Sequence, residues 1–500
     1  MDKSQVYLKV ERLYNEAKPT LDRLAHNGIK RDPLAKYCLV TYPPRSASPK
    51  IEGLEEQVKI SETIFGKVAE SNPNADLYIH TAFCSRACSF CNFYFQPGVP
   101  NFNGLSNLYV ETVEKEVELL REKTDGNFRV KSIYFGGGSP SLLSPEQVSR
   151  VMDKIRNSFS LEDGLEISFE LHPEIVRLQG DAKSYINGLV NTGVNRFSVS
   201  FQSVDDTILR STKRGHTSEE ALRVFDEIRG KERTNIDLMW GFRNQDLDSY
   251  FRSLETVYSL GPDSVTTYSL EIRPGSPDHP NYLDLTKEHF EKLIRMSLLT
   301  RVIAESQGYS ERTFDYWFKN DDFEHMKRKW GGDDTVLLTL GPGTYNWVFV
   351  GAQNNFVFYK PYNLTDYIKC IEEGVIPIER ASKLNKNETF RRHLMFKMRA
   401  SHIPKDWLSS RIDNLDENTR EEVNKTFRGL ISLGVMEDKE NRLALSTAGR
   451  VLNHETSSLF SSDNVIGTAL EKETDEESRY SSFVEPNMIS RYKDFIKKQG

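Results

Sequence analysis

Three cysteines stand close together in the segment Tyr78-Ile79-His80-Thr81-Ala82-Phe83-Cys84-Ser85-Arg86-Ala87-Cys88-Ser89-Phe90-Cys91. Their C-x3-C-x2-C spacing follows an apolar stretch that predicts a short strand over residues 77–80. The cysteines therefore stand at the end of a strand, where a loop can present all three to one ligand.

Only five cysteines occur in the 500 residues, and an odd, clustered set of this kind is not a disulfide framework. Thiolates bind soft metals, so the cluster predicts zinc or an iron–sulfur centre. Three thiolates would leave one iron of a four-iron cluster open to a ligand that is not protein. A structural zinc site needs a fourth ligand close by, and His80 keeps that alternative open.

Strand-length apolar runs alternate with helical patterns through the middle of the chain. The predicted strands are residues 77–80, 130–135, 165–171, 196–202, 235–240 and 264–272. Between them apolar side chains recur at spacings of three and four, and Ser144-Pro145-Glu146-Gln147 is a helix start signal. Repeated strand and helix units predict an α/β fold, a partial (β/α)6 TIM-type barrel with its chemistry at the carboxyl ends of the strands.

The remaining composition divides the chain into five predicted parts. These are an N-terminal extension (1–75), the partial barrel (76–308), an aromatic-rich region that we expect to cap the barrel (309–380), a small winged-helix-like α+β domain (381–456) and a tail (457–500). Winged-helix domains often bind DNA, but the fold also serves protein contacts, and this segment is not clearly basic.

Charge and hydropathy narrow the classes of partner. The 66 Lys and Arg against 73 Asp and Glu give a net charge of −7, which disfavours bulk attraction to nucleic acid or anionic lipid. No apolar run approaches the roughly 18 to 20 residues of a membrane span, and the first residues lack a signal peptide. We expect a cytoplasmic protein that binds neither membrane nor nucleic acid.

Five further segments, in order along the chain, carry a resemblance to a known family. They are Leu77-Tyr78-Ile79-His80, Ile133-Tyr134-Phe135-Gly136-Gly137-Gly138-Ser139-Pro140, Glu166-Ile167-Ser168-Phe169-Glu170-Leu171-His172-Pro173, Asn195-Arg196-Phe197-Ser198-Val199-Ser200-Phe201-Gln202 and Asn235-Ile236-Asp237-Leu238-Met239-Trp240-Gly241. With the cysteine spacing and Phe90, these segments resemble the radical S-adenosylmethionine (SAM) superfamily, and within it the oxygen-independent coproporphyrinogen III dehydrogenases.

The resemblance implies a [4Fe–4S] cluster on Cys84, Cys88 and Cys91, and a SAM molecule bound to the open iron. It assigns the approach to the SAM amino group to Gly136, Gly137 and Gly138. It gives the ribose, amino and carboxylate groups of SAM to Glu170, Gln202, Arg214 and Asp237, for each of which a surface salt bridge is the ordinary alternative. Tyr78 and Phe93 match packing positions around the cluster and the sulfonium.

Members of this family divide into coproporphyrinogen dehydrogenases, haem chaperones, and radical methylases or cyclopropanases that use two SAM molecules. The first group has a further cysteine where this chain has Phe93, and an Arg before the segment answered here by Thr41-Tyr42-Pro43. The chaperones resemble the chain through His325 and Trp330, although a solvated histidine in a charged stretch is the simpler interpretation. The aromatic run Phe93-Tyr94-Phe95, an N-terminal extension and a winged-helix-like domain resemble the third group.

We therefore expect a radical SAM enzyme that transfers a methyl or methylene unit from a second SAM to an sp² carbon. Its substrate would be small and planar, such as a heteroaromatic, a polyene or a tetrapyrrole, held by stacking on the aromatic side chains. A flavodoxin or ferredoxin type of protein would supply the electron. Oxidative decarboxylation of coproporphyrinogen III and haem carriage remain the alternatives.

Overall fold

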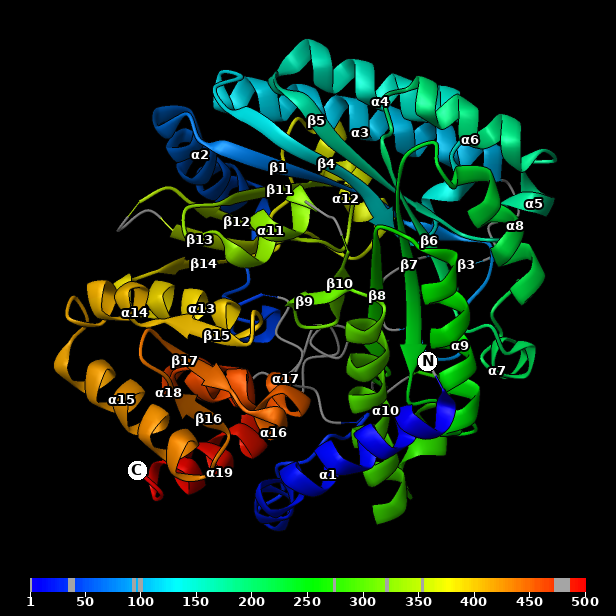
Figure 1. The fold of residues 1–500 in the computed structure, drawn as a ribbon. Coiled ribbons are helices and arrows are strands. Elements are labelled where there is room, and N and C mark those ends of the chain that lie inside the picture. The colour runs from blue at the N-terminus through cyan, green and yellow to red at the C-terminus, as the bar shows by residue number, and fades with distance from the viewer. Residues whose placement is uncertain are drawn as a thin grey trace. The chain divides into compact units, whose positions relative to one another are not determined.

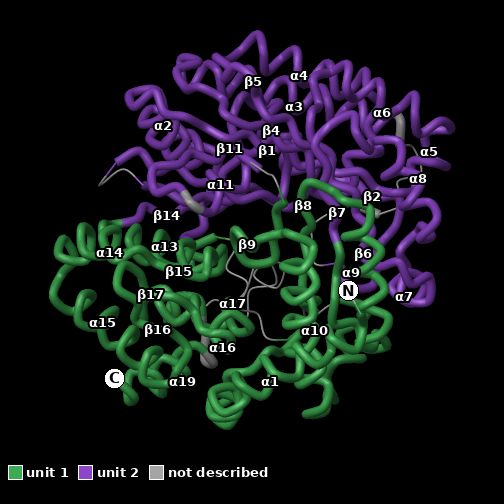
Figure 2. Tube along the Cα trace, viewed as in Figure 1, with its two compact units in different colours: residues 1–47, 238–321, 385–500 green, residues 48–237, 322–384 purple. Residues whose placement is uncertain are grey.

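The computed structural model describes residues 2–34, 41–91, 96–97, 102–272, 276–319, 323–351, 355–471 and 486–500. The chain divides into two compact units, one of residues 48–237 and 322–384, called here the cysteine unit, and one of residues 1–47, 238–321 and 385–500, called the terminal unit (Figure 2). Strand β7 (Arg233–Trp240) runs from the first unit into the second. The five parts predicted from the sequence remain a proposal.

The cysteine unit is built on one large sheet. The strands of this unit are β1 (Asn74–Thr81), β2 (Phe83–Cys84), β3 (Gln96–Pro97), β4 (Arg129–Gly137), β5 (Ser160–Leu171), β6 (Arg196–Gln202), β11 (Val336–Leu340), β12 (Tyr345–Phe349), β13 (Asn355–Tyr359) and β14 (Arg380–Leu384). The order in the main sheet is β14-β13-β12-β11-β1-β4-β5-β6, followed by β7. Strands β11, β1, β4, β5 and β6 pair in parallel, whereas β12, β13 and β14 continue the sheet antiparallel.

Helices follow the strands of this unit in alternation, as the sequence pattern predicts. They are α2 (Gly53–Ser71), α3 (Phe102–Thr124), α4 (Pro145–Ser158), α5 (Ile175–Leu178), α6 (Ala182–Asn191), α7 (Asp206–Ser211), α8 (Ser218–Ile228), α11 (Glu324–Gly331), α12 (Leu364–Glu372) and the 3-10 turn η2 (Pro140–Leu142). The predicted start of α4 is confirmed, because the Ser144 hydroxyl accepts from the Gln147 amide at 3.2 Å and the Gln147 side chain accepts from the Ser144 amide at 3.0 Å. Helices α3 and α4 pack against each other on the outer side of the sheet (Figure 1).

The two faces of the parallel strands differ in polarity. Leu77, Ile133, Phe169 and Val199 are fully buried on one face, whereas the residues that follow them, Tyr78, Tyr134, Glu170 and Ser200, are polar and lie on the other face. The apolar face packs under the outer helices. The polar face is the inner face of these strands, and it carries hydrogen-bonding groups.

The terminal unit contains the last barrel elements and the small C-terminal domain. Its helices are α1 (Lys3–His26), α9 (Leu247–Leu260), α10 (Lys287–Ser306), α13 (Lys386–Met398), α14 (Lys405–Ile412), α15 (Glu417–Ser432), α16 (Thr447–Val451), α17 (Asn453–Ser457), α18 (Asp463–Glu471) and α19 (Pro486–Lys497), with 3-10 turns η1 (Arg45–Ala47), η3 (His279–Tyr282) and η4 (Ser458–Phe460). Its strands are β8 (Ser264–Ser269), β9 (Ser310–Thr313), β10 (Tyr316–Phe318), β15 (His402–Pro404), β16 (Met436–Asp438) and β17 (Arg442–Leu445).

The six strands predicted for the barrel all form, as β1, β4, β5, β6, β7 and β8. In the C-terminal segment, β15, β17 and β16 form a three-stranded antiparallel sheet in that order, and the winged-helix-like domain predicted there remains a proposal. Aromatic residues that we expected in a cap, such as Trp347 and Phe358, are buried in the added strands β12 and β13. Within the described residues, no helix is both long and apolar enough to cross a membrane.

One buried ion pair ties the added strands to helix α3. Lys360 Nζ contacts Glu116 Oε1, while Tyr367 and the Gly341 amide donate to Glu116 Oε2 at 2.6 and 3.0 Å. Glu116 and Lys360 are each 1% exposed. We predict that Glu116→Gln lowers the free energy of unfolding by about 3 to 5 kcal/mol, since it leaves the Lys360 charge buried without that carboxylate.

Chemical denaturation of the purified protein measures this loss. Glu219→Gln is the matched control, because Glu219 pairs with Arg223 on an exposed helix surface and its loss should not change stability. Equal stabilities of the Glu116 and Glu219 variants would contradict the prediction.

Candidate functional site

The cysteine loop begins directly at the end of β1 and has little regular structure of its own. Its first turn is held by the glycine run after β4: the Gly138 amide donates to the Thr81 carbonyl at 2.7 Å, and the Ser139 amide donates to the Phe83 carbonyl at 2.6 Å. The short strand β2 also pairs with β3, with Cys84 opposite Pro97. The loop is therefore fixed by backbone contacts at the carboxyl edge of the sheet.

All three cysteines are partly exposed. Burial raises the pKa of Cys84 well above its usual range, and negative charge on Cys91 and Cys88 raises it further. A bound metal cluster would supply the positive charge that three neighbouring thiolates need.

No three His, Cys, Asp or Glu side chains among the described residues converge on a single-ion site. A cubane cluster takes each thiolate on a different iron, so its cysteines need not converge on one point. Arg214 Nη1 lies 3.5 Å from Cys88 Sγ, in position to hydrogen-bond the sulfur of a ligated cysteine. The donor set of soft thiolates beside a cation fits an iron–sulfur cluster.

Close packing explains why residues 136 to 138 are glycines. A Cβ at Gly136 would lie 2.8 Å from the Tyr78 hydroxyl and 2.9 Å from Glu170 Oε1. A Cβ at Gly137 would overlap the His80 ring, and one at Gly138 would overlap the Phe83 carbonyl. The absence of side chains therefore lets the turn pack against the cysteine loop, and an approach to SAM is a further role that we propose.

Glu170 and Asp237 lie on the polar face of β5 and β7. Burial raises the pKa of Glu170 to about 8, and the negative charge of Asp237 contributes to the rise. Tyr134 donates to Glu170 Oε1 at 2.9 Å, and Ser198 donates to Asp237 Oδ2 at 2.8 Å. Two carboxylates in a poorly hydrated cavity favour a cationic ligand, because a cation relieves their mutual repulsion.

Gln202 and Arg214 carry the strongest local signs of a binding site in this unit. Gln202 ends β6 with φ of 64°, a left-handed conformation that costs energy for a residue with a side chain, and its buried Oε1 has no hydrogen-bond partner among the described residues. Arg214 Nη2 donates to Ser200 Oγ at 2.7 Å, while its buried Nε also lacks a partner within the described chain. Such strained or unsatisfied polar groups fit a ligand that completes their bonds.

Two aromatic residues of the predicted site are visible. Tyr78 stacks on Tyr134 with ring centroids 5.7 Å apart, and Phe90 is buried inside the cysteine loop at 9% exposure. Both pack within the protein. Phe93 lies outside the described residues.

The structure adds polar residues that the motifs did not single out. Ser198 and Asn235 hold Asp237, with Asn235 Nδ2 donating to Asp237 Oδ1 at 2.8 Å, and Ser200 holds Arg214. The sequence pattern that indicates them is the alternation of polar residues along the predicted strands. Every predicted cofactor contact that is described lies in the cysteine unit.

His325 does not have the environment that the sequence indicated. It is 2% exposed, and its Nδ1 lies 2.8 Å from Ser132 Oγ on the polar face of β4. Burial lowers its pKa well below the usual range, so the ring is neutral. The solvated histidine expected from the charged stretch is wrong, because α11 packs this side chain into the barrel, and a haem ligand would need the ring to be accessible.

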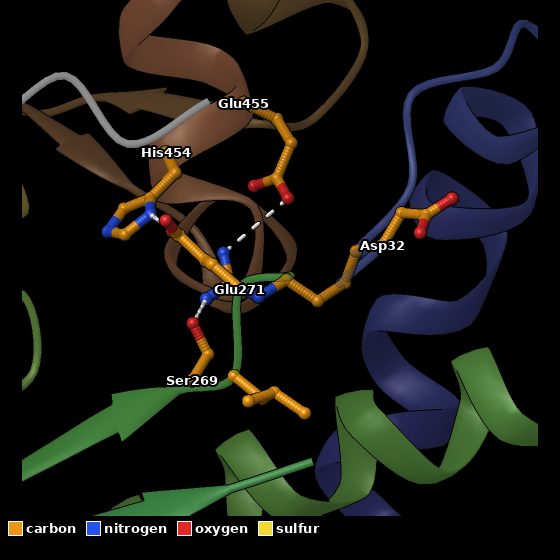
Figure 3. A pocket seen from close by; sticks show the side chains of 7 residues that line it. Asp32, Ser269, Glu271, His454 and Glu455 are labelled. Carbon is orange, nitrogen blue, oxygen red and sulfur yellow. Dashed lines mark hydrogen bonds and ion pairs between the residues drawn. The ribbon is translucent and has the colours of Figure 1, made fainter. Parts of the chain in front are cut away.

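A polar cavity lies in the terminal unit, where β8 ends. Figure 3 shows His454 and Glu455 of α17 facing Ser269 and Glu271. Arg31 contacts Glu455 Oε1 at 3.5 Å, and burial raises the pKa of Glu455 to about 7. The cavity therefore combines donors and acceptors at the carboxyl end of a barrel strand, the edge where such folds bind substrates.

The raised pKa of Glu170 makes a prediction about stability. Because the pKa rises from an ordinary 4.5 to about 8, the folded protein holds a proton that the unfolded chain releases, and folding stability falls as pH rises through that window. Glu170→Gln should therefore be more stable than wild type at pH 8 by at least about 1 kcal/mol and equal to it near pH 4.5. Thermal unfolding across this pH range measures the difference, and a variant less stable at pH 8 would contradict it.

Comparisons with known proteins agree with this geometry. Residues 78–257 match the radical SAM superfamily. The chain is 26% identical over 269 residues to the haem chaperone HemW of Buchnera aphidicola, covering 53% of this chain and 68% of that one. It is 25% identical over 331 residues to an oxygen-independent coproporphyrinogen III oxidase of Synechocystis sp., covering 63% of this chain and 68% of that one.

Among solved structures, coproporphyrinogen III oxidase (HemN) from Escherichia coli, a radical SAM enzyme, has the same fold. The match has a TM-score of 0.71 at 21% identity and covers 85% of this chain and 96% of that one. The superfamily implies a [4Fe–4S] cluster and SAM for the site of Cys84, Cys88 and Cys91. Residues 78–257 thus form a radical SAM domain, and the chain is similar in sequence and fold to oxygen-independent coproporphyrinogen III oxidases.

Proposed function

We propose that the chain binds a [4Fe–4S] cluster on Cys84, Cys88 and Cys91 and one SAM across the polar face of β5, β6 and β7. The observations that carry this proposal are the electrostatic influence of Asp237 on the buried Glu170 and the unsatisfied Gln202 amide oxygen at the end of β6. SAM carries a sulfonium and an ammonium, which suit the carboxylates, and hydroxyls and a carboxylate, which suit Gln202 and Arg214. The cluster and SAM together supply a 5′-deoxyadenosyl radical when reduced.

The residues of the chain have defined tasks in this proposal. Glu170 and Asp237 hold the positive groups of SAM, and Ser198 and Asn235 keep the Asp237 carboxylate in one orientation. Arg214, itself held by Ser200, places a positive charge beside Cys88.

For the reaction itself, we propose transfer of a methyl or methylene unit from a second SAM to an sp² carbon of a planar substrate of tetrapyrrole type. The support is sequence alone: Phe93 replaces a cysteine of the decarboxylating group, and the Arg of its N-terminal segment is missing before Thr41. The reductant would be a flavodoxin or ferredoxin type of protein.

Oxidative decarboxylation of coproporphyrinogen III is the second candidate, and the relatives favour it. The oxidases match over more of this chain than the HemW chaperones do, 63% against 53% for the two compared above. Haem carriage through His325 has less support, because that ring is buried against Ser132.

Cluster and SAM binding can be tested separately from the substrate. Anaerobic reconstitution should give about four iron atoms per chain and a reduced EPR signal that SAM perturbs. Cys88→Ala should lose 5′-deoxyadenosine formation while keeping its fold, since the barrel core does not include the loop. Stoichiometric zinc with no uptake of iron would overturn the assignment.

The SAM contacts predict a second result. Asp237→Ala and Gln202→Ala should weaken SAM binding about tenfold or more in equilibrium dialysis, because each loses a buried polar partner of the ligand. Their thermal unfolding should change far less than that of Glu116→Gln. Unchanged SAM affinity in both variants would show that the ligand lies elsewhere.

Product analysis distinguishes the two reactions. With planar substrates under reducing, anaerobic conditions, methylene transfer should yield both 5′-deoxyadenosine and S-adenosylhomocysteine, with label from the SAM methyl group in the product. Decarboxylation should yield 5′-deoxyadenosine and carbon dioxide without S-adenosylhomocysteine. Loss of two carboxyl groups from coproporphyrinogen III with no transferred label would reject the methylase proposal.

A further inference from the structure

A buried carboxylate outside the predicted site holds the cysteine loop. Between Cys84 and Cys88, the Ser85 hydroxyl donates to Glu174 Oε2 at 2.6 Å, and Arg86 Nη2 donates to Glu174 Oε1 at 2.7 Å. Glu174 is 2% exposed and lies just after β5, about 90 residues further along the chain. Two consecutive loop residues thus donate hydrogen bonds to the two oxygens of one buried carboxylate.

The surroundings of Glu174 hold that carboxylate in one position. Arg177 Nη2 donates to Glu174 Oε1 at 3.3 Å, so two guanidinium groups share the carboxylate. The Glu174 amide donates to His172 Nδ1 at 3.2 Å, and the pKa of His172 is lowered well below its usual range by burial and by Arg214. His172 is therefore neutral, and its ring fixes the backbone of Glu174 without adding charge.

Backbone packing from a third segment fits the same arrangement. A Cβ at Gly215 would overlap both Arg86 Nε and Glu174 Oε1, so a glycine is required for the two charged groups to meet there. The neighbouring Arg214 reaches Cys88 Sγ, and the Ser89 amide donates to the Thr212 carbonyl at 3.1 Å. The loop is thus held on one side by Glu174 and on the other by residues 212–215.

We propose that Glu174 is a positioning residue that fixes the loop from Cys84 to Cys88 for cluster binding and sets the charge around the cluster. This inference rests on the proposed cluster. A loop held by charge-assisted hydrogen bonds presents its thiolates in one geometry and releases iron slowly. The negative charge of Glu174 also offsets Arg86 and Arg177, and an excess of positive charge near a cluster makes its reduction easier.

The test compares Glu174→Gln with Glu220→Gln in the full-length, reconstituted protein. Glu220 accepts from Arg177 Nε at 2.9 Å but does not touch the cysteine loop, and glutamine can keep its place in the capping box of α8. In Glu174→Gln, we expect iron loss to a chelator to accelerate about tenfold or more and the midpoint potential of the cluster to rise. Glu220→Gln should match wild type in iron retention and raise the potential far less than Glu174→Gln does.

Arg86→Gln separates the charge from the geometry. It removes a positive charge, so the midpoint potential should fall, while the chelator should again remove iron faster because the loop loses the same contact. The double variant Glu174→Gln, Arg86→Gln should return the potential toward wild type and keep the fast iron loss. A merely structural role would move iron retention without these opposed shifts of potential.

The outcomes distinguish this inference from the proposal on which it depends. If the wild-type chain takes up no iron, the proposed function fails. If wild type binds its cluster and Glu174→Gln matches it in both iron retention and potential, the cluster assignment stands and the role of Glu174 is overturned. Circular dichroism of the apo variants checks the fold, and a Glu174→Gln chain that is unfolded while Arg86→Gln is normal would also overturn it.

Discussion

The cysteine loop can act only where other parts of the cysteine unit hold it, because the segment from Cys84 to Cys91 makes few backbone hydrogen bonds of its own. The Gly138 and Ser139 amides fix its first turn, and Glu174 fixes the two residues after Cys84. Each anchor stands at the carboxyl end of a parallel strand. The strand order of the sheet therefore determines where the thiols lie.

The same sheet resolves a conflict between stability and function. Burying Glu170 near Asp237 costs folding energy, and that cost is tolerated because the opposite faces of the strands bury Leu77, Ile133 and Phe169 completely. The positive φ and the unsatisfied amide of Gln202 belong to the same pattern. These features lower the stability of the folded chain. A binding site for SAM, which the likeness to the superfamily implies, would explain why they are present.

Shared architecture leaves the reaction open. The HemN match covers 85% of the chain at 21% identity, which speaks for the fold. In the proposed function the barrel provides a radical, and the contacts around it select what the radical meets. The choice of substrate therefore depends on individual side chains rather than on the fold.

The sequence by itself determined the six barrel strands and the start of helix α4, and it predicted a soft-metal site on the cysteine loop. Strand-length apolar runs, the capping box at Ser144 and the cysteine spacing are local signals, and each needs only a few neighbouring residues. It did not show that α11 buries His325 against Ser132, or that Glu174 meets Arg86 some 88 positions away. Contacts of that kind depend on which strands lie side by side and on desolvation, and only the tertiary structure decides both.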